Sequence, residues 1–265
     1  MAQACPALGK SEVRSSKFEV KKSETFTNMI FIVVFVLVFL GVSARWNWWR
    51  LPARGLPILM YHKIGCSPPG SKQKKLWVST EQFRRQMEYL RKRGYQPLTF
   101  PELSVLVDAG RPVPEKGVII TFDDGYRNNY EEAFPILKEF GFKAVVFLVT
   151  NTVEKDNAWH DPSSETRVPM LSWGQVEEMA SWGIEFGSHT LTHTRLSSLP
   201  PESLEKELTE SKKILMEKLG REPVSFAHPY GNGQDNASIR EKIRQTGYRW
   251  ACSVHQGKAD VKNDP

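Results

Sequence analysis

The sequence predicts an α/β domain built on a parallel sheet or barrel, preceded by one apolar helix. Three observations carry this prediction: strand and helix patterns alternate from residue 56 onward, residues 29–44 contain no charged side chain, and four expected strands end in polar or ionisable residues. Repeated βα units with short connections are typical of parallel sheets. The 265 residues, 40% hydrophobic and 25% charged, exclude a disordered, collagen-like or disulfide-dense chain.

The first element is the apolar run, which we predict to be an uncleaved transmembrane signal anchor. Residues 26–44 are about long enough to cross a bilayer core, lysines precede them, and three tryptophans follow within residues 45–50. A cleaved signal peptide is an alternative, because Val42-Ser43-Ala44 resembles a cleavage site. A buried core helix is another, although the run lacks a polar face.

The resulting domain prediction has four parts. Residues 1–28 form a short cytoplasmic segment, 29–44 the transmembrane anchor, 45–55 a juxtamembrane linker, and 56–265 one folded domain. The domain is expected on the extracytoplasmic side of the membrane.

Local start and stop signals define the elements of this domain. Ser79 to Gln82 and Ser172 to Gln175 are capping boxes, and Asn236 is a good N-cap. We expect strands at residues 57–61, 118–122, 144–149, 184–186, 224–226 and 248–254. We expect helices at residues 79–93, 101–110, 130–140, 172–183 and 201–219, and one that starts at Asn236.

Reactive side chains follow four of the strands. They are His62, the Asp123-Asp124-Gly125 turn, the segment 188–193 with two histidines, and His228-Pro229-Tyr230-Gly231. The carboxyl ends of parallel strands form the active-site face of α/β folds. We therefore expect these side chains to meet.

Asp124, His189 and His193 are candidate metal ligands. The two histidines are four residues apart, so a helical turn would direct both toward one ion, although this spacing also occurs in surface pairs. Two imidazoles and one carboxylate match the three-ligand pattern of a catalytic zinc. Asp123 beside them favours a division of roles, with one carboxylate binding metal and the other acting as base; an ordinary Asp-Asp-Gly turn is the alternative.

Three segments together resemble the motifs of NodB-type polysaccharide deacetylases, carbohydrate esterase family 4. They are Thr121 to Gly125, His189-Thr190-x-x-His193, and Pro229-Tyr230-Gly231. The three occur in the family's order, and the resemblance covers roughly residues 56–255.

The resemblance implies a distorted (β/α) barrel that holds a divalent metal, most often zinc, with cobalt or nickel as alternatives. It makes Asp124, His189 and His193 the ligands and Asp123 the general base that activates the attacking water. It also implies that the backbone N–H of Tyr230 stabilises the oxyanion.

Two departures from the family pattern concern the acid and the base. Ala227 stands where an arginine commonly pairs with the base, and the usual late Leu-x-His segment is not evident. Leu59-Met60-Tyr61-His62 instead resembles a circularly permuted subgroup that deacetylates poly-β-1,6-N-acetylglucosamine. We therefore expect His62 to be the general acid; His255, or a merely structural role for His62, are the alternatives.

Other side chains have weaker predicted roles. Trp173, Pro229 and His228 are expected to contact substrate, although Trp173 could be a core aromatic and His228 a structural residue. His160 and the charged helix 201–219 are expected to be solvated.

The predicted function is a metal-dependent hydrolase that removes N-acetyl groups from an extracellular or envelope N-acetylglucosamine polysaccharide. A polysaccharide O-acetyl esterase and a catalytically impaired carbohydrate-binding module are the alternatives. Nucleic acid is not an expected partner, because residues 1–54 hold eight basic and three acidic residues while the other 28 basic residues meet 27 acidic ones. No protein partner is indicated, and Cys66 and Cys252 either pair or remain free thiols.

Overall fold

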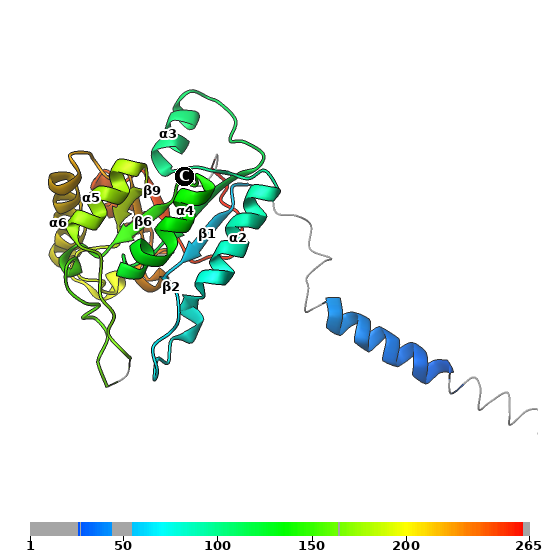
Figure 1. Cartoon of the computed structure of the whole chain (residues 1–265). Coiled ribbons are helices and arrows are strands. Elements are labelled where there is room, and N and C mark those ends of the chain that lie inside the picture. Colours follow the sequence, from blue (N-terminus) through cyan, green and yellow to red (C-terminus); the bar gives the residue numbers. More distant parts are fainter. Residues whose placement is uncertain (1–25, 27, 44–54, 164, 262–265) are drawn as a thin grey trace, which may run out of the picture. The chain divides into compact units, whose positions relative to one another are not determined.

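The computed structural model describes Phe26 and residues 28–43, 55–163 and 165–261, and the chain divides into two compact units at residues 53 and 54. In the first unit, Phe26 and residues 28–43 are helical (Figure 1). Among the described residues, no helix combines the length and the hydropathy that a membrane span requires. The predicted linker and the N-terminal cytoplasmic segment lie almost wholly outside the described residues.

The second unit is built on a parallel sheet (Figure 1). Its strands are β1 (Ile58–Tyr61), β4 (Gln96–Pro97), β5 (Gly117–Phe122), β6 (Val145–Leu148), β7 (Glu185–Ser188), β8 (Ser225–Ala227) and β9 (Trp250–Cys252). The strand order is β1-β5-β6-β7-β8-β9. The short strand β4 pairs with the first two residues of β5, and β1 pairs with the residues of β5 that follow. Within the described residues no ladder joins β9 to β1, so the expected barrel is an open half-barrel.

Helices connect the strands, and predicted caps set where three of them start. They are α2 (Thr80–Lys92), α3 (Phe100–Asp108), α4 (Phe134–Phe140), α5 (Trp173–Trp182), α6 (Pro201–Leu219) and α7 (Ala237–Gln245). The Ser79 hydroxyl accepts from the Gln82 N–H at 3.2 Å, and Asn236 accepts from two N–H groups at the start of α7. The capping box at Ser172 is formed in full.

Several short elements differ from the sequence prediction. β2 (Lys63–Ile64) and β3 (Trp77–Val78) form a separate two-residue parallel pair, and β4 was also not predicted. The helix expected from residue 130 starts as a π-helical turn, Asn129–Ala133, and becomes α-helical only at Phe134.

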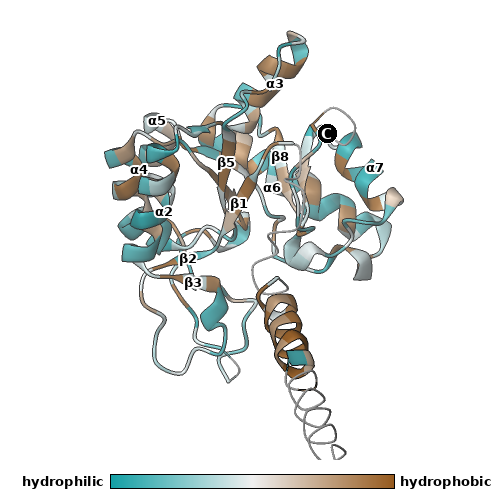
Figure 2. Ribbon diagram, turned by 90° about the vertical axis from the view of Figure 1, so that its right-hand side faces the viewer, coloured by the Kyte–Doolittle hydropathy of each residue, from teal (hydrophilic) through white to brown (hydrophobic). Residues whose placement is uncertain are grey.

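The sheet is covered on both faces, because every residue of β5 and β6 is buried. One core cluster joins Phe122 and Val146 to Phe83 and Met87 of α2, whereas another joins Phe147 to helix α3 and to β9. Figure 2 shows hydrophobic strands β1 and β5 and a hydrophilic outer side on α2. Burial on both faces makes the sheet a rigid platform for the loops at its carboxyl edge.

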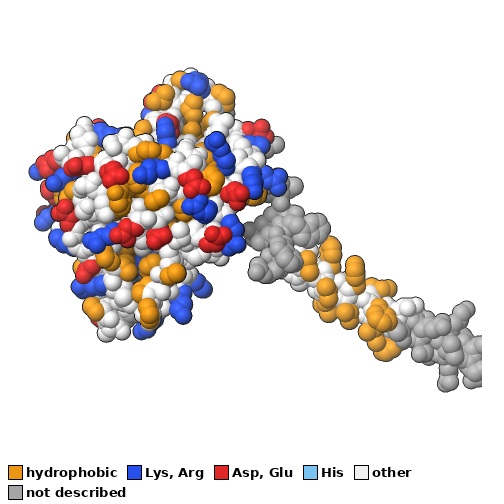
Figure 3. Space-filling model, in the orientation of Figure 1, with side chains coloured by type: hydrophobic (Ala, Val, Ile, Leu, Met, Phe, Trp, Pro, Cys, Tyr) orange, Lys and Arg blue, Asp and Glu red, His pale blue; other side chains and the backbone are white. Residues whose placement is uncertain are grey.

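Charges on the domain surface are mixed. In Figure 3, Lys and Arg alternate with Asp and Glu over the visible face of the second unit, without a large region of one sign. This face therefore lacks the basic stripe that phosphate backbones select.

Glu185, at the start of β7, is buried inside the sheet. One carboxylate oxygen accepts from the Phe100 N–H at 2.8 Å and the other from the Ser225 hydroxyl at 2.9 Å. Burial nevertheless dominates these bonds and raises the pKa of Glu185 to about 7.

We expect Glu185→Gln to remove a pH-dependent loss of stability. Because the folded-state pKa exceeds the unfolded value, the folded state binds the extra proton, and stability falls as pH rises from about 4.5 through about 7. Urea unfolding should give near-equal stability at pH 5 and a variant more stable by about 2–3 kcal/mol at pH 8. If the difference in unfolding free energy between wild type and variant were the same at pH 5 and pH 8, a buried, protonated Glu185 would be contradicted.

Candidate metal centre and active site

The polar side chains predicted at the strand ends meet in one pocket of about 310 Å³ at the carboxyl edge of the sheet. The predicted residues that line it are His62, Asp123, Asp124, His189, His193, His228 and Tyr230. They follow β1, β5, β7 and β8, so the half-barrel brings together residues as far apart in sequence as His62 and Tyr230.

Asp124, His189 and His193 converge on one point. Asp124 Oδ1 lies 3.3 Å from His189 Nε2 and 3.0 Å from His193 Nε2, and all three side chains are buried. The three candidate ligand atoms lie within 4.8 Å of one another. This is the cluster that the sequence predicted as a metal site.

The outer hydrogen bond of His189 directs its Nε2 lone pair inward, and that of His193 allows the same tautomer. His189 Nδ1 lies 2.9 Å from the Ala227 carbonyl oxygen, which can only accept, so Nδ1 carries the proton. His193 Nδ1 lies 3.0 Å from the Tyr230 hydroxyl, which can accept in the same way. Asp124 Oδ1 is buried without a hydrogen-bond donor among the described residues. Two imidazole nitrogens and one bare carboxylate oxygen therefore fit a divalent cation such as zinc.

The turn that carries the two histidines is not helical, so the helical-turn explanation of their convergence is wrong. Thr190 and His193 adopt positive φ values of 69° and 62°, and the His193 N–H donates to the Thr190 hydroxyl at 3.0 Å. The carboxylate of Glu207 in α6 accepts from the Leu191 N–H at 2.9 Å and from the Thr192 N–H at 3.0 Å. Both histidines face the metal point because the Glu207 carboxylate holds this strained turn through these two hydrogen bonds.

Helix α6 is consequently more than a solvated face, which corrects the sequence prediction for residues 201–219. Its Glu207, Ser211 and Lys212 are buried, and the Ser211 hydroxyl donates to the Glu207 carbonyl oxygen one turn earlier in the same helix. The charged pattern of the helix did not indicate that Glu207 supports the turn.

The two adjacent aspartates differ in protonation tendency. Burial raises the pKa of Asp123 against the opposing pull of His62 and His189. Burial acts on Asp124 in the same direction, but His193 and His189 outweigh it and hold the pKa of Asp124 well below its usual range. Such a separation is characteristic of carboxylates with different chemical roles.

The Asp-Asp-Gly turn owes its shape to two positive φ values, 76° at Asp124 and 84° at Gly125. A Cβ on Gly125 would collide with Leu148 on the neighbouring strand β6. Glycine is therefore required after the two carboxylates, both for the backbone conformation and for the close approach to β6.

Tyr230 contacts the metal cluster with its side chain, through His193. Its ring packs edge-on against His193 at 4.5 Å, and the Arg195 guanidinium lies over the Tyr230 ring at 4.5 Å. The hydroxyl contact to His193 was not predicted from the sequence.

His228 and Pro229 occupy different positions relative to the pocket. His228 lines it, with Nδ1 at 3.2 Å from the Asn232 carbonyl oxygen, and burial lowers the pKa of His228 to about 4. Its imidazole is therefore neutral at pH 7. Pro229 is buried beside it and is not among the lining side chains.

The aromatic wall of the pocket is Trp159 rather than Trp173. Trp173 starts α5, packs against the core and lies under Lys218 of α6, so its predicted substrate contact is not supported by its position. Trp159 lies 4.4 Å from the His193 ring, and His160, which we expected to be solvated, lines the same pocket. Both belong to a loop with no periodic pattern, so only their residue types could have indicated a role for them.

His255 and the two cysteines lie outside the catalytic cluster. His255 is exposed, bonds to Asp235 at 2.9 Å and does not line the metal pocket, whereas His62 does. Cys66 and Cys252 are free thiols.

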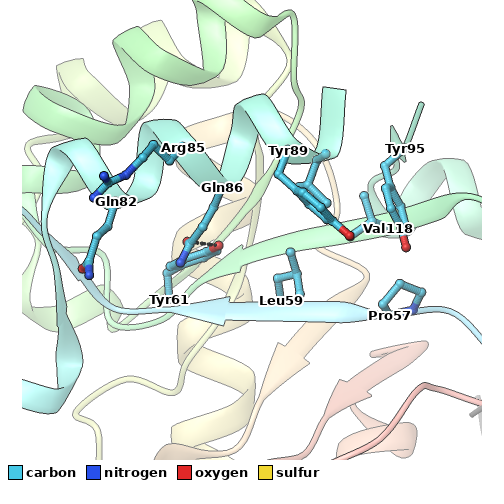
Figure 4. A pocket seen from close by; sticks show the side chains of 10 residues that line it. Pro57, Leu59, Tyr61, Gln82, Arg85, Gln86, Tyr89, Tyr95 and Val118 are labelled. Atoms are coloured by element: carbon cyan, nitrogen blue, oxygen red, sulfur yellow. Dashed lines mark hydrogen bonds between the residues drawn. The ribbon is translucent and has the colours of Figure 1, made fainter. Parts of the chain in front are cut away.

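A larger hollow of about 580 Å³ lies between α2 and β1 (Figure 4). The Tyr61 hydroxyl donates to Gln86 across it at 2.7 Å. Its lining contains neither a carboxylate nor a histidine, so this hollow lacks the groups for hydrolysis. Its lining residues are Pro57, Leu59, Tyr61, Gln82, Arg85, Gln86, Tyr89, Leu90, Tyr95 and Val118.

Comparisons with known proteins identify relatives of this chain. The family model described as polysaccharide deacetylase matches residues 110–251. YxkH of Bacillus subtilis, whose name assigns it to the same family, is 33% identical over 82% of this chain and 70% of its own length. Poly-beta-1,6-N-acetyl-D-glucosamine N-deacetylase of Escherichia coli K12 is 26% identical over 79% of this chain, which spans only 35% of that relative.

The fold is similar to that of a solved deacetylase. The Streptococcus pyogenes deacetylase PplD, in complex with acetate, superposes with a TM-score of 0.68 at 26% identity, over 80% of this chain and 88% of PplD.

Proposed function

The chain belongs to the polysaccharide deacetylase family, and we propose that it removes N-acetyl groups from a poly-N-acetylglucosamine with the help of a divalent metal. One observation carries the proposal: the buried Asp124, His189 and His193 converge in the same pocket as Asp123 and His62. A metal site, a candidate base and a candidate acid within one pocket form the set that amide hydrolysis requires.

Asp124, His189 and His193 would hold the metal, and zinc suits their two nitrogens and one oxygen best. When bound, the cation supplies a Lewis acid and lowers the pKa of water. The chain's own residues position it through the outer bonds to Ala227 and Tyr230.

The remaining steps belong to side chains on either side of that centre. Asp123 accepts a proton from the water that attacks the acetyl carbonyl carbon, and the carbonyl becomes a tetrahedral oxyanion. The backbone N–H of Tyr230 donates to this oxyanion. His62 then donates its proton to the nitrogen as the C–N bond breaks, so that acetate and a free amine leave.

The β-1,6 linkage is our first choice for the polymer. It rests on the substrate named for the E. coli relative and on the resemblance of Leu59-Met60-Tyr61-His62 to the permuted subgroup. We also propose that the second unit acts on the extracytoplasmic side of a membrane and that residues 29–44 anchor it there. The charge-free run and the extracellular substrate class support this placement.

We expect acetate release from N-acetylglucosamine oligomers to depend on restored metal. The full chain would be stripped with a chelator and assayed on β-1,6- and β-1,4-linked oligomers with added Zn²⁺ or Co²⁺. Metal-dependent acetate from the β-1,6 series, and little from the β-1,4 series, is the expected result. Acetate only from O-acetylated polysaccharide would identify an esterase, and a folded, zinc-loaded chain that binds oligomers without product would identify a binding module.

A further inference from the structure

His62 lies between two strands and belongs to neither. β1 ends at Tyr61, whose carbonyl accepts the last bond from β5 at the Asp123 N–H, and β2 starts at Lys63. Within the described residues the His62 imidazole makes no hydrogen bond, so its position depends on how its backbone is held.

The backbone of His62 is held by the segment that follows the metal-binding turn. Asn129 donates from Nδ2 to the His62 carbonyl oxygen at 2.8 Å, and Asn128 accepts from the Ile64 N–H at 3.1 Å. Between them, the buried Lys63 ammonium lies 4.7 Å from the Tyr126 ring. Two hydrogen bonds and one cation–π contact therefore join residues 62–64 to Tyr126, Asn128 and Asn129.

Asn129 is the central member of this connection. It is 1% exposed, and it starts the π-helical turn that leads into α4. Single π turns inside helices occur frequently at functional sites. Asn129 lies four residues after Gly125, the last residue of the Asp-Asp-Gly turn. From the π-helical turn its side-chain amide reaches the carbonyl oxygen of His62.

We propose that Asn129 is a positioning residue that holds His62 at the distance from the metal centre needed for protonating the leaving amine. The role rests on the proposed deacetylase function, and specifically on His62 as the acid. It connects the segment with Asp123 and Asp124 to the acid by one part-buried hydrogen bond, so we expect base, metal ligand and acid to move as one unit. A misplacement of about 1 Å in such a unit costs about 10²-fold in rate.

The test compares an amide with an ester. Amine departure needs a proton, whereas 4-nitrophenolate leaves 4-nitrophenyl acetate as an anion, so a misplaced acid affects only the amide. Full-length wild type, Asn129→Ala, His62→Ala and the double variant would be loaded with zinc and assayed on N-acetylglucosamine oligomers and on the ester. Zinc affinity would be measured alongside.

We expect Asn129→Ala to lower kcat on the amide about 10²-fold while the ester rate and zinc affinity stay near wild type. In the His62→Ala background the same substitution should add almost nothing, because both changes act on one proton transfer. Asn129→Leu nearly keeps the side-chain size but cannot donate a hydrogen bond, and it serves if the alanine variant does not fold.

Asn236→Ala is the matched control. It removes the N-cap of α7, far from His62 in sequence and outside the pocket, and should lower the unfolding midpoint without changing the amide-to-ester ratio. Equal losses of activity on the amide and on the ester in Asn129→Ala would overturn the positioning role. The role would also be overturned if adding Asn129→Ala to His62→Ala lowered amide activity as much as it does in the wild type. If His62→Ala itself failed to discriminate amide from ester, the acid assignment would fall and Asn129's role with it.

Discussion

Asp123→Asn is expected to reduce deacetylation about 10³-fold while the protein retains its zinc. The carboxylate of Asp123 shares the pocket with the metal cluster but is not one of its three converging ligand atoms. An amide of the same shape cannot accept the proton of the attacking water, and the loss of a general base typically costs 10²–10⁴-fold.

The measurement combines acetate release with zinc content by elemental analysis after dialysis. The loss should lie in kcat, because the variant keeps the groups that bind the oligomer. A zinc-free Asp123→Asn would reverse the assignment of the two aspartates.

The same substitution one residue later, Asp124→Asn, is expected to give the opposite result for the metal. Asp124 Oδ1 lies within 3.3 Å of both histidine Nε2 atoms, and the pKa of Asp124 is held well below its usual range by His193 and His189. A neutral amide oxygen is a poorer ligand for zinc than a carboxylate. Zinc affinity should fall by at least about 10²-fold, and deacetylation with it.

Thermal unfolding distinguishes the two variants without reference to activity. Zinc at about 100 times its dissociation constant stabilises a folded protein by about 2.7 kcal/mol. Wild type and Asp123→Asn should therefore unfold at a higher temperature with zinc than with chelator, whereas Asp124→Asn should show no shift. Because the two variants make the same chemical change at neighbouring buried positions, each is the control for the other.

The main strands and helices were predictable because their signals are local. The caps at Ser79, Ser172 and Asn236 fix where three helices begin, and the apolar run of β5 indicates a buried strand. The two-residue strands β2, β3 and β4 carry no such signal. Their extended conformation results from pairing with a distant partner, which a local pattern does not record.

The residues of the site were predictable, whereas their geometry was not. His189 and His193 converge because Glu207, 14 residues beyond His193, holds a turn with positive φ. No spacing rule contains that contact. Trp159 lines the pocket from an irregular loop, whereas the more regular sequence around Trp173 led to a core residue.

The backbone around the metal point has a consequence for how tightly the ion is held. Of the five non-glycine residues with positive φ in the described chain, four belong to the site: Asp124, Thr190, His193 and Tyr230. Each such conformation costs on the order of 1–3 kcal/mol. Hydrogen bonds within the chain hold the turn with Thr190 and His193, so we expect the ligands to be arranged before an ion binds.

A preformed site of this kind takes up and releases its ion without refolding. We therefore expect the empty and the loaded protein to have the same fold and to interconvert readily. If the activity depends on the ion as proposed, the supply of the ion in the surroundings would set the fraction of molecules that are active, and scarcity of zinc would reversibly limit deacetylation.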